Sequence, residues 1–194
     1  IKYRDLNGDG VINEQDQRKI GDANLAEWSY GFFVGAAYKG FDVKALFTGV
    51  ANRDYTYGDL NIMAFKNEAG NGNEWGGGSV QKYHLENRYN PQDPSTWRTA
   101  KYPRLSLLGG THNRLDSDFW QDNGNFLRLK TLEIGYTLPQ NWTRKVKISK
   151  ARIFYTGYNL FTWHNMRVID PESQPGACNY PVQKVSSFGL SLQF

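Results

Sequence analysis

The chain ends in Lys184-Val-Ser-Ser-Phe188-Gly-Leu190-Ser-Leu192-Gln-Phe194, and this stretch decides the fold. Every second residue from Phe188 onward is apolar, and the residues between are small or polar. Because the side chains of a strand alternate between two faces, the pattern predicts a strand with one apolar and one polar face. In outer-membrane β-barrels, lipid-facing and lumen-facing residues alternate in this way. We therefore expect a barrel-closing carboxy-terminal signal made of Phe188, Leu190, Leu192 and Phe194.

The composition is compatible with this interpretation. The 194 residues suit one domain, and no run approaches the roughly 18 consecutive apolar residues of a membrane-spanning helix. The mean hydropathy of −0.66 does not exclude a barrel, since half of each strand faces a polar lumen and long loops dilute the rest. The 23 Lys and Arg residues are scattered, so no basic run or recognition helix indicates a nucleic-acid ligand.

The clearest internal strands are residues 28–38 and 41–49. Both alternate apolar with small or polar residues, and only Lys39-Gly40 separates them. Two alternating segments joined by so short a connection predict a β-hairpin with a tight turn. A soluble all-β module could contain the same hairpin, but it would bury the apolar stripe of 28–38 under a second sheet, whereas a barrel exposes it to lipid.

Two longer segments, 125–136 and 151–161, are rich in aromatic and β-branched residues and also predict strands. The polarity of the first changes phase near Lys130, which indicates a β-bulge or a strand that extends beyond the bilayer. Residues 1–3 resemble the middle of one more strand. About six strands are therefore expected, each about 9–11 residues long as a tilted membrane strand requires. The fold class is all-β, an antiparallel transmembrane β-barrel segment, and six strands are too few to close a barrel.

Long and short connections alternate along the chain. Outer-membrane barrels have short periplasmic turns and longer extracellular loops, so residues 39–40 and 137–149 are expected in the periplasm, together with the carboxy terminus. The extracellular loops would then be about 5–27, 50–118 and 162–183. The loop 50–118 has no clear periodicity, and we expect it to fold over a pore rather than to form regular structure.

Residues 5–16 have the spacing of a calcium-binding loop. Oxygen-bearing side chains occupy positions 1, 3, 5, 9 and 12, with glycine at position 6 and an apolar residue at position 8. Position 12 is Asp rather than the usual bidentate Glu, as in dockerin-type loops. The alternative is a pair of glycine turns with incidental acids. We expect a structural Ca²⁺ held by Asp5, Asn7, Asp9, the carbonyl of Val11, Asn13 and Asp16.

Catalysis is not indicated by any motif in the sequence. The three histidines, His84, His112 and His164, lie in loops without Cys or carboxylate at metal-ligand spacing, so we expect them to face solvent. The single cysteine, Cys178, lies in a loop rich in Pro and Gly and is expected to be an unpaired thiol. Neither a Gly-rich phosphate cradle nor a nucleophile elbow occurs. The chain is not expected to be an enzyme.

A series of short motifs follows one another along the chain. They are Lys2-Tyr-Arg-Asp-Leu-Asn-Gly-Asp-Gly-Val-Ile12, Tyr30-Gly-Phe32, Tyr38-Lys-Gly-Phe-Asp42, Ala100-Lys-Tyr-Pro103, Phe126-Leu-Arg-Leu-Lys130, Gly135-Tyr-Thr-Leu-Pro139, Asn159-Leu-Phe-Thr162, Asp170-Pro-Glu172, Tyr180-Pro181 and the terminal Phe194. In this order they resemble the carboxy-terminal portion of SusC/RagA-type TonB-dependent transporters of Bacteroidetes. The resemblance covers essentially the whole chain except the loop interior at roughly 55–95.

This resemblance implies the last strands of a barrel of about 22 strands with an amino-terminal plug. It also implies a SusD-like surface lipoprotein that closes over the barrel as a lid, and import of glycans or peptides with energy from TonB. The plug and the rest of the SusC barrel would precede Ile1, so the plug is absent from residues 1–194 and this chain alone would not transport. The implied location is the bacterial outer membrane. Whether the cargo is a glycan or a peptide is left open.

A soluble, calcium-stabilised, all-β glycan-binding module is the alternative function. In either case the aromatic side chains of the long loop are candidates for stacking on sugars or contacting the lid, because an aromatic face complements the apolar face of a pyranose. Their other role would be packing within the loop itself. The candidate substrate-binding residues are Trp75, Tyr83, Trp97, Tyr102 and Trp120.

Overall fold

The computed structural model describes residues 1–57, 80–105, 111–173 and 180–194. Within these ranges the chain divides into two compact units. The strand unit holds residues 23–55, 123–173 and 180–194, and the loop unit holds residues 1–22 and the described part of 56–122. Trp75 and Cys178, which were discussed above, lie outside the described residues.

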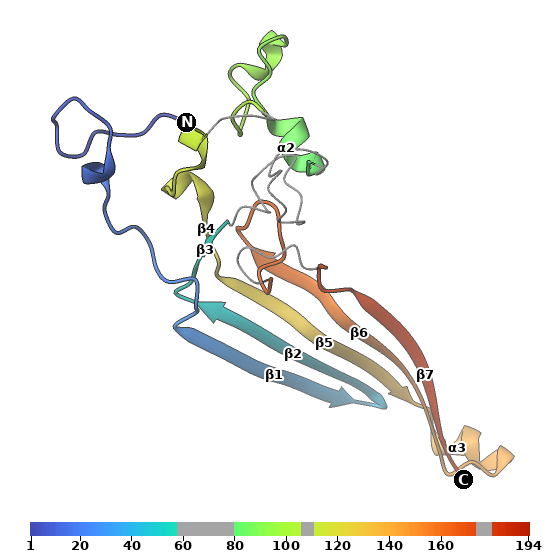
Figure 1. Ribbon diagram of the computed structural model, residues 1–194. Coiled ribbons are helices and arrows are strands. Elements are labelled where there is room, and N and C mark those ends of the chain that lie inside the picture. The colour runs from blue at the N-terminus through green and yellow to red at the C-terminus, as the bar shows by residue number, and fades with distance from the viewer. Residues whose placement is uncertain (58–79, 106–110, 174–179) are drawn as a thin grey trace, which may run out of the picture. The chain divides into compact units, whose positions relative to one another are not determined.

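The strand unit is a single five-stranded antiparallel sheet with the order β1-β2-β5-β6-β7 (Figure 1). Its members are β1 (Trp28–Tyr38), β2 (Phe41–Ala51), β5 (Phe126–Thr137), β6 (Lys150–His164) and β7 (Val185–Gln193). Each strand pairs with the next one of the sheet along the chain. The five strands expected from alternation and from aromatic and β-branched content are confirmed, with ends that differ by a few residues, most at β6.

The hairpin between β1 and β2 turns at Lys39-Gly40, as predicted. Both residues have positive φ, 48° for Lys39 and 88° for Gly40. Two successive left-handed residues characterise the two-residue turn whose twist matches that of the flanking strands. The carbonyl of Gly40 also accepts a hydrogen bond from the amide of Thr137 at 2.8 Å, so the turn is tied to the end of β5.

The predicted irregularity near Lys130 is a β-bulge. On one side of β5, Leu129 pairs with Phe47 while Thr131 pairs with Leu46, so that Lys130 is the extra residue. The register toward β6 shifts at the same place. A bulge lets the apolar residues on both sides of the shift stay on one face. The change of polarity phase in the sequence is therefore explained.

The expectation of a strand at residues 1–3 is wrong. This segment is irregular and is held by bonds to residues far along the chain. The hydroxyl of Tyr3 donates to the carbonyl of His112 at 2.6 Å, and the carbonyl of Ile1 lies 3.0 Å from His112 Nε2. Polar groups that form such hydrogen bonds do not require pairing with a neighbouring strand. The main sheet therefore has five strands rather than about six.

The long connection from β2 to β5 contains regular structure, contrary to expectation. Its elements are β3 (Asp54–Thr56), α2 (Lys82–Asn87), the 3-10 turns η2 (Pro94–Thr96), η3 (Thr111–Arg114) and η4 (Asp118–Trp120), and β4 (Gln121–Asn123), which pairs with β3. A further 3-10 turn, η1 (Glu14–Asp16), precedes β1. Each element is only three to six residues long, too short to produce a recognisable period in the sequence.

The connection between β5 and β6 is a compact turn made of α3 (Gln140–Thr143) and η5 (Arg144–Val146). It is anchored to β7, because Ser149 donates both its amide and its hydroxyl to the carbonyl of Gln193, each at 2.8 Å. α3 and the carboxy terminus thus lie at the same end of the sheet (Figure 1). Within the described residues, no helix has both the length and the apolar character needed to cross a membrane.

Candidate functional site

One face of the five-stranded sheet is apolar from edge to edge. Cross-strand partners share a face, and two complete rows of partners can be followed from β1 to β7. The side chains of these rows are largely exposed, up to 84% for Phe188, and no second sheet covers the stripe of β1 in the part of the chain that the structure describes. The rows are Tyr38, Phe41, Tyr136, Ile153 and Leu190, then Ala36, Val43, Ile134, Tyr155 and Phe188.

The opposite face is mixed: small and charged residues form one complete row, whereas the adjacent row, Phe33, Leu46, Thr131, Tyr158 and Val185, is largely apolar. A row on this face consists of Gly35, Lys44, Glu133, Thr156 and Ser187. Charged residues thus occur on this face and not in the two apolar rows, a contrast typical of the lumen-facing and lipid-facing sides of a barrel wall. The apolar alternation of the terminal strand, from which the face assignment began, holds for Phe188, Leu190 and Leu192, which are 84%, 61% and 42% exposed.

An ion network crosses the polar face near the short turns. Arg152 donates from Nε to Asp42 Oδ1 at 3.0 Å and from Nη2 to Glu133 Oε1 at 2.6 Å, and it pairs a second time with Asp42. Gly135 leaves the space that the guanidinium occupies, since a Cβ at this position would collide with it. Three strands are thereby linked by charge on the lumen-type face, where such groups do not meet lipid.

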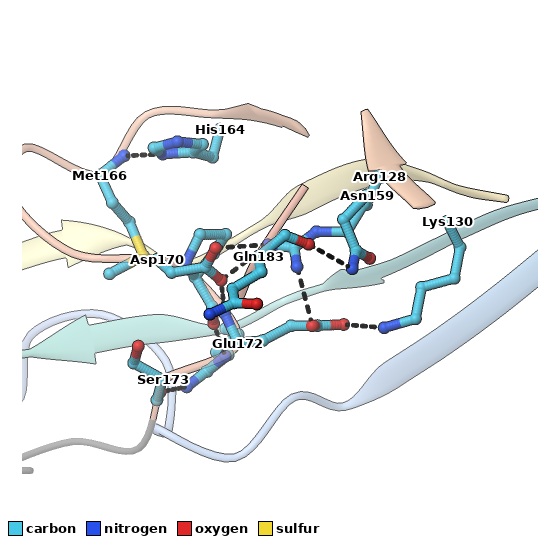
Figure 2. A network of polar contacts seen from close by, with 11 residues as sticks. Arg128, Lys130, Asn159, His164, Met166, Asp170, Glu172, Ser173 and Gln183 are labelled. Carbon is cyan, nitrogen blue, oxygen red and sulfur yellow. Dashed lines mark hydrogen bonds and ion pairs between the residues drawn. The ribbon is translucent and has the colours of Figure 1, made fainter. Parts of the chain in front are cut away.

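A second and more buried ion network holds the segment that follows β6 (Figure 2). Arg128, on β5, has a side chain that is 1% exposed. Its Nη2 contacts both carboxylate oxygens of Asp170 at 2.7 Å, and its Nη1 contacts Glu172 Oε2 at 2.9 Å. Lys130 reaches the other oxygen of Glu172 at 3.5 Å. Hydrogen bonds between two charged groups are the stronger class of hydrogen bond.

Arg53 donates hydrogen bonds to the backbone of the same segment. It donates from Nη1 to the carbonyl of Pro171 at 2.7 Å and from Nη2 to that of Ser173 at 3.4 Å, and Pro171 is fully buried. We call Arg53, Arg128 and residues 170–173 the arginine clamp. Sequence reasoning missed it, because Arg128 and Asp170 are 42 residues apart and no local pattern connects them.

The predicted calcium loop is a compact hydrogen-bonded turn. Asp5, at position 1, accepts from the amides of Gly8 at 2.6 Å and Gly10 at 2.8 Å. Both glycines have positive φ, 79° and 83°, which other residues adopt at a cost. Asp9 accepts from the amide of Val11 at 2.7 Å. Glycine at position 6 is thus required by the backbone, as the motif predicts.

Asp16, at position 12, closes the loop on itself. One carboxylate oxygen accepts from the amide of Leu6 at 2.7 Å and the other from the amide of Asn13 at 2.9 Å. These backbone hydrogen bonds, chiefly those from Asn13 and Leu6, lower the pKa of Asp16 below its usual 3.8. The oxygen that accepts from Leu6 also accepts from the amide of Asn7 at 3.4 Å. Because a carboxylate oxygen has two lone pairs, only the oxygen bonded to Asn13 keeps capacity for an ion. Among the described residues, however, no three His, Cys, Asp or Glu side chains converge as a ready metal site.

The candidate substrate-binding aromatic residues differ in their exposure to solvent. Tyr102 and Trp120 are each 5% exposed and pack with Tyr83, His84 and Phe119 in the core of the loop unit. Their rings therefore serve packing, which was the alternative role. Tyr83 is half-buried at the edge of this aromatic cluster. Trp97 is 55% exposed and remains available to a ligand.

The expectation that all three histidines face solvent is wrong for one of them. His84 is 5% exposed, with its ring 4.5 Å from that of Tyr102. An imidazole in an aromatic cluster contributes an apolar ring face to the core. His112 and His164 are exposed as predicted. The ring of His112 lies 3.0 Å from the carbonyl of Ile1, 111 residues away, and the ring of His164 accepts from the amide of Met166.

Comparison with known proteins gives relatives along the whole chain. The sequence is 27% identical over 206 residues to TonB-dependent receptor P26 of Formosa agariphila, covering 100% of this chain and 19% of that protein. It is 26% identical to TonB-dependent receptor P3 of the same organism, covering 99% and 19%. The chain thus spans about a fifth of the length of these relatives. No protein-family model matches it.

The fold resembles part of a solved importer. The structure of the RagAB peptide importer in the closed-closed state matches with a TM-score of 0.62 at 23% identity, and the open-open state with 0.60 at 22%; each match covers 95% of this chain and 19% of the RagAB chain. The class of the fold is therefore all-β, an antiparallel sheet of the transmembrane β-barrel kind, here an open segment. The resemblance to SusC/RagA-type TonB-dependent transporters, which the sequence motifs indicated, is confirmed.

Proposed function

We propose that this chain forms the carboxy-terminal part of the barrel wall in an outer-membrane, TonB-dependent nutrient importer. The observation that carries the proposal is the apolar face that runs without interruption across all five strands. A soluble glycan-binding module would have to bury that face, whereas a barrel exposes it to lipid. Similarity to TonB-dependent receptors over the full chain supports the same conclusion.

The chain acts here as a passive structure rather than as an enzyme. The strands form part of the barrel wall. The long connections form part of a substrate vault on the extracellular side; they are residues 5–27, 50–118 and 162–183, with approximate bounds. The carboxy terminus lies in the periplasm. A plug domain would couple the barrel to TonB, and a SusD-like lipoprotein would close the vault. The name of the RagAB peptide importer supports peptides as one class of cargo, beside glycans.

Mass spectrometry of the detergent-solubilised native complex tests this function. We expect peptides from a plug and the remaining barrel, together with a surface lipoprotein, to be recovered with this chain. The identity of the lipoprotein would narrow the class of cargo. Recovery of residues 1–194 alone, water-soluble and monodisperse without detergent, would instead establish the soluble module.

We further propose that residues 5–16 bind a structural Ca²⁺ that stiffens an extracellular turn. The spacing of six oxygen donors supports this, as do the left-handed glycines and the amide bonds that hold Asp5 and Asp16 in one loop. The ligands would be the side chains of Asp5, Asn7, Asp9, Asn13 and Asp16 and the carbonyl of Val11. The role is local stiffening, because the flanking segments are not long helices that an ion could reorient.

Removing the ion is expected to expose the turn to protease. With Ca²⁺ present, trypsin should cleave after Arg18 and Lys19 slowly in the native complex, and addition of a chelator should accelerate cleavage at least several-fold. The double variant Asp5→Asn/Asp9→Asn should be cleaved rapidly with or without Ca²⁺. Glu14→Gln, which changes an acid at a non-ligand position of the same loop, is the matched control. Equal cleavage of the wild-type protein with and without the ion would refute the site.

Acid should weaken the loop only at unusually low pH. Because the pKa of Asp16 is lowered in the folded loop, its contribution is complete above the unfolded value of about 3.9 and is lost as pH falls through the folded value. A ¹³C NMR titration of the Asp16 carboxyl in the calcium-free protein should therefore give a midpoint below 3.8. A midpoint at or above this value would mean that the amide bonds from Leu6 and Asn13 do not form in solution.

A further inference from the structure

An open pocket of about 350 Å³ lies within the loop unit, beside the segment that follows α2. Two short stretches line it, and both carry an arginine. Except for Leu105 and Pro91, its walls are polar or amphipathic side chains. The lining residues are Arg88, Tyr89, Asn90, Pro91, Gln92, Arg104 and Leu105.

Backbone pairing brings the two arginines to the same pocket. Arg88 and Tyr102 form a parallel bridge, in which the amide of Tyr89 donates to the carbonyl of Tyr102 at 2.8 Å and the amide of Tyr102 donates to Asn87 at 3.0 Å. Arg104 follows two residues later. Since the ring of Tyr102 is anchored in the buried aromatic cluster, the bridge that joins the two stretches is tied to the core of the loop unit.

The loop that forms the pocket wall is also held in place. Thr96 Oγ1 accepts from the amide of Asn90 at 3.0 Å, and it lies 3.1 Å and 2.8 Å from the carbonyls of Asn90 and Asp93. The indole of Trp97 donates to the carbonyl of Asn90 at 3.3 Å. A wall tied by this many bonds loses little further entropy when a ligand binds.

The region around the pocket carries a net positive charge. Residues 88–104 contain four basic side chains, Arg88, Arg98, Lys101 and Arg104, and one acid, Asp93, a net charge of 4 − 1 = +3. Asp93 caps the following turn by accepting from the amide and hydroxyl of Ser95 at 3.0 and 2.7 Å. It does not line the pocket.

The pocket arginines differ from those of the sheet in their partners. Arg128 and Arg152 each pair with two carboxylates. Within the described residues, neither Arg88 nor Arg104 forms an ion pair with an acid, and Arg88 donates from Nη1 to the carbonyl of Leu85. A guanidinium has five donors, so Arg88 keeps donors for a ligand after making that bond.

We propose that this pocket binds a carboxylate group of the imported cargo through Arg88 and Arg104. The planar fork of a guanidinium matches a carboxylate bidentately, and two forks on neighbouring stretches favour an anion over a neutral amide or hydroxyl. The carboxylate could come from an acidic peptide or from a uronic acid of a glycan. The inference deepens the proposed import function and rests on it.

Isothermal titration calorimetry on the purified native complex tests the pocket. The probes are triglutamate against triglutamine, and trigalacturonate against its methyl ester. We expect one acidic probe to bind at least about tenfold more tightly than its neutral partner, as hydrogen bonds to charged groups warrant, and the preference to fall with added salt. The acidic probe that binds identifies whether the source is a peptide or a glycan.

Three arginine variants test whether the acidic probe binds in this pocket. Arg104→Gln, and Arg88→Gln together with it, should reduce the preference for the acidic probe at least about tenfold. Arg98→Gln removes an exposed arginine of the same loop that does not line the pocket and should change affinity less than about twofold. Because Arg104 is itself exposed, its single substitution should leave the fold intact.

The possible outcomes distinguish failure of the pocket proposal from failure of the proposed import function. Equal affinity of acidic and neutral probes in an intact complex overturns the pocket, as does an acidic preference that survives Arg88→Gln/Arg104→Gln. Failure of the wild-type chain to purify with the remaining barrel and a lipoprotein would overturn the importer function itself.

Discussion

Replacing Leu190 with arginine is expected to destabilise the barrel by about 2–4 kcal/mol, the cost of placing this charge on the lipid face near the bilayer midplane. Leu190 lies one residue from the centre of β7 and in a row of apolar side chains that extends to β1. Its side chain is 61% exposed in the open sheet. On the apolar face, lipid rather than water would surround the added guanidinium.

The loss can be measured as a shift in the urea-unfolding midpoint of the complex reconstituted in lipid. Ser187→Arg is the matched control, since it adds the same charge to the same strand on the polar face, in the row that contains Glu133. We expect that variant to differ from the wild type by less than about 1 kcal/mol. Equal stability of the two variants would reverse or abolish the assignment of the lipid face.

Replacing Arg128 with methionine is expected to destabilise the protein by about 3 kcal/mol and to free the segment after β6. Removing one partner of a buried ion pair typically costs about 3–5 kcal/mol. The lower end applies here, because the side chains of Asp170 and Glu172 are 16% and 30% exposed and water can reach them. Methionine keeps much of the apolar volume, so the loss reports on charge more than on packing.

Urea unfolding and proteolysis of the connection between β6 and β7 would report on the two effects separately. Lys130→Met is the control: this side chain is 39% exposed and its contact with Glu172 is long, 3.5 Å, so the loss should be below about 1 kcal/mol. The double variant Arg128→Met/Asp170→Asn should recover part of the loss of Arg128→Met. A loss for Arg128→Met no larger than that for Lys130→Met would show that the arginine clamp does not hold the segment.

The strands of the sheet could be predicted because their signal is local. Alternation with period two is visible within about ten residues, and it depends only on the pleat of the backbone. The turn at Lys39-Gly40 and the bulge at Lys130 were predictable for the same reason, since each interrupts that alternation at one point. The motifs of the calcium loop are likewise contained in twelve consecutive residues.

The candidate sites in the long loops were predicted less well. Aromatic residues were expected at a ligand surface, but Tyr102 and Trp120 form the core of the loop unit while Trp97 is exposed. Nothing in the neighbouring sequence distinguishes these three, because burial is decided by which distant segments pack together. The pocket lined by Arg88 and Arg104 depends in the same way on a bridge between residues fourteen apart.

The order of residues alone was sufficient to predict the five strands, the alternating faces of β1, β2 and β7, the hairpin and the likeness to TonB-dependent transporters. Only the tertiary structure decided that residues 1–3 are not part of the sheet, that the long connection has its own aromatic core, and that Arg128 contacts Asp170 and Glu172. The difference is physical. Hydrophobic alternation acts between neighbours in the chain, whereas ion pairs and aromatic packing join residues that only folding brings together.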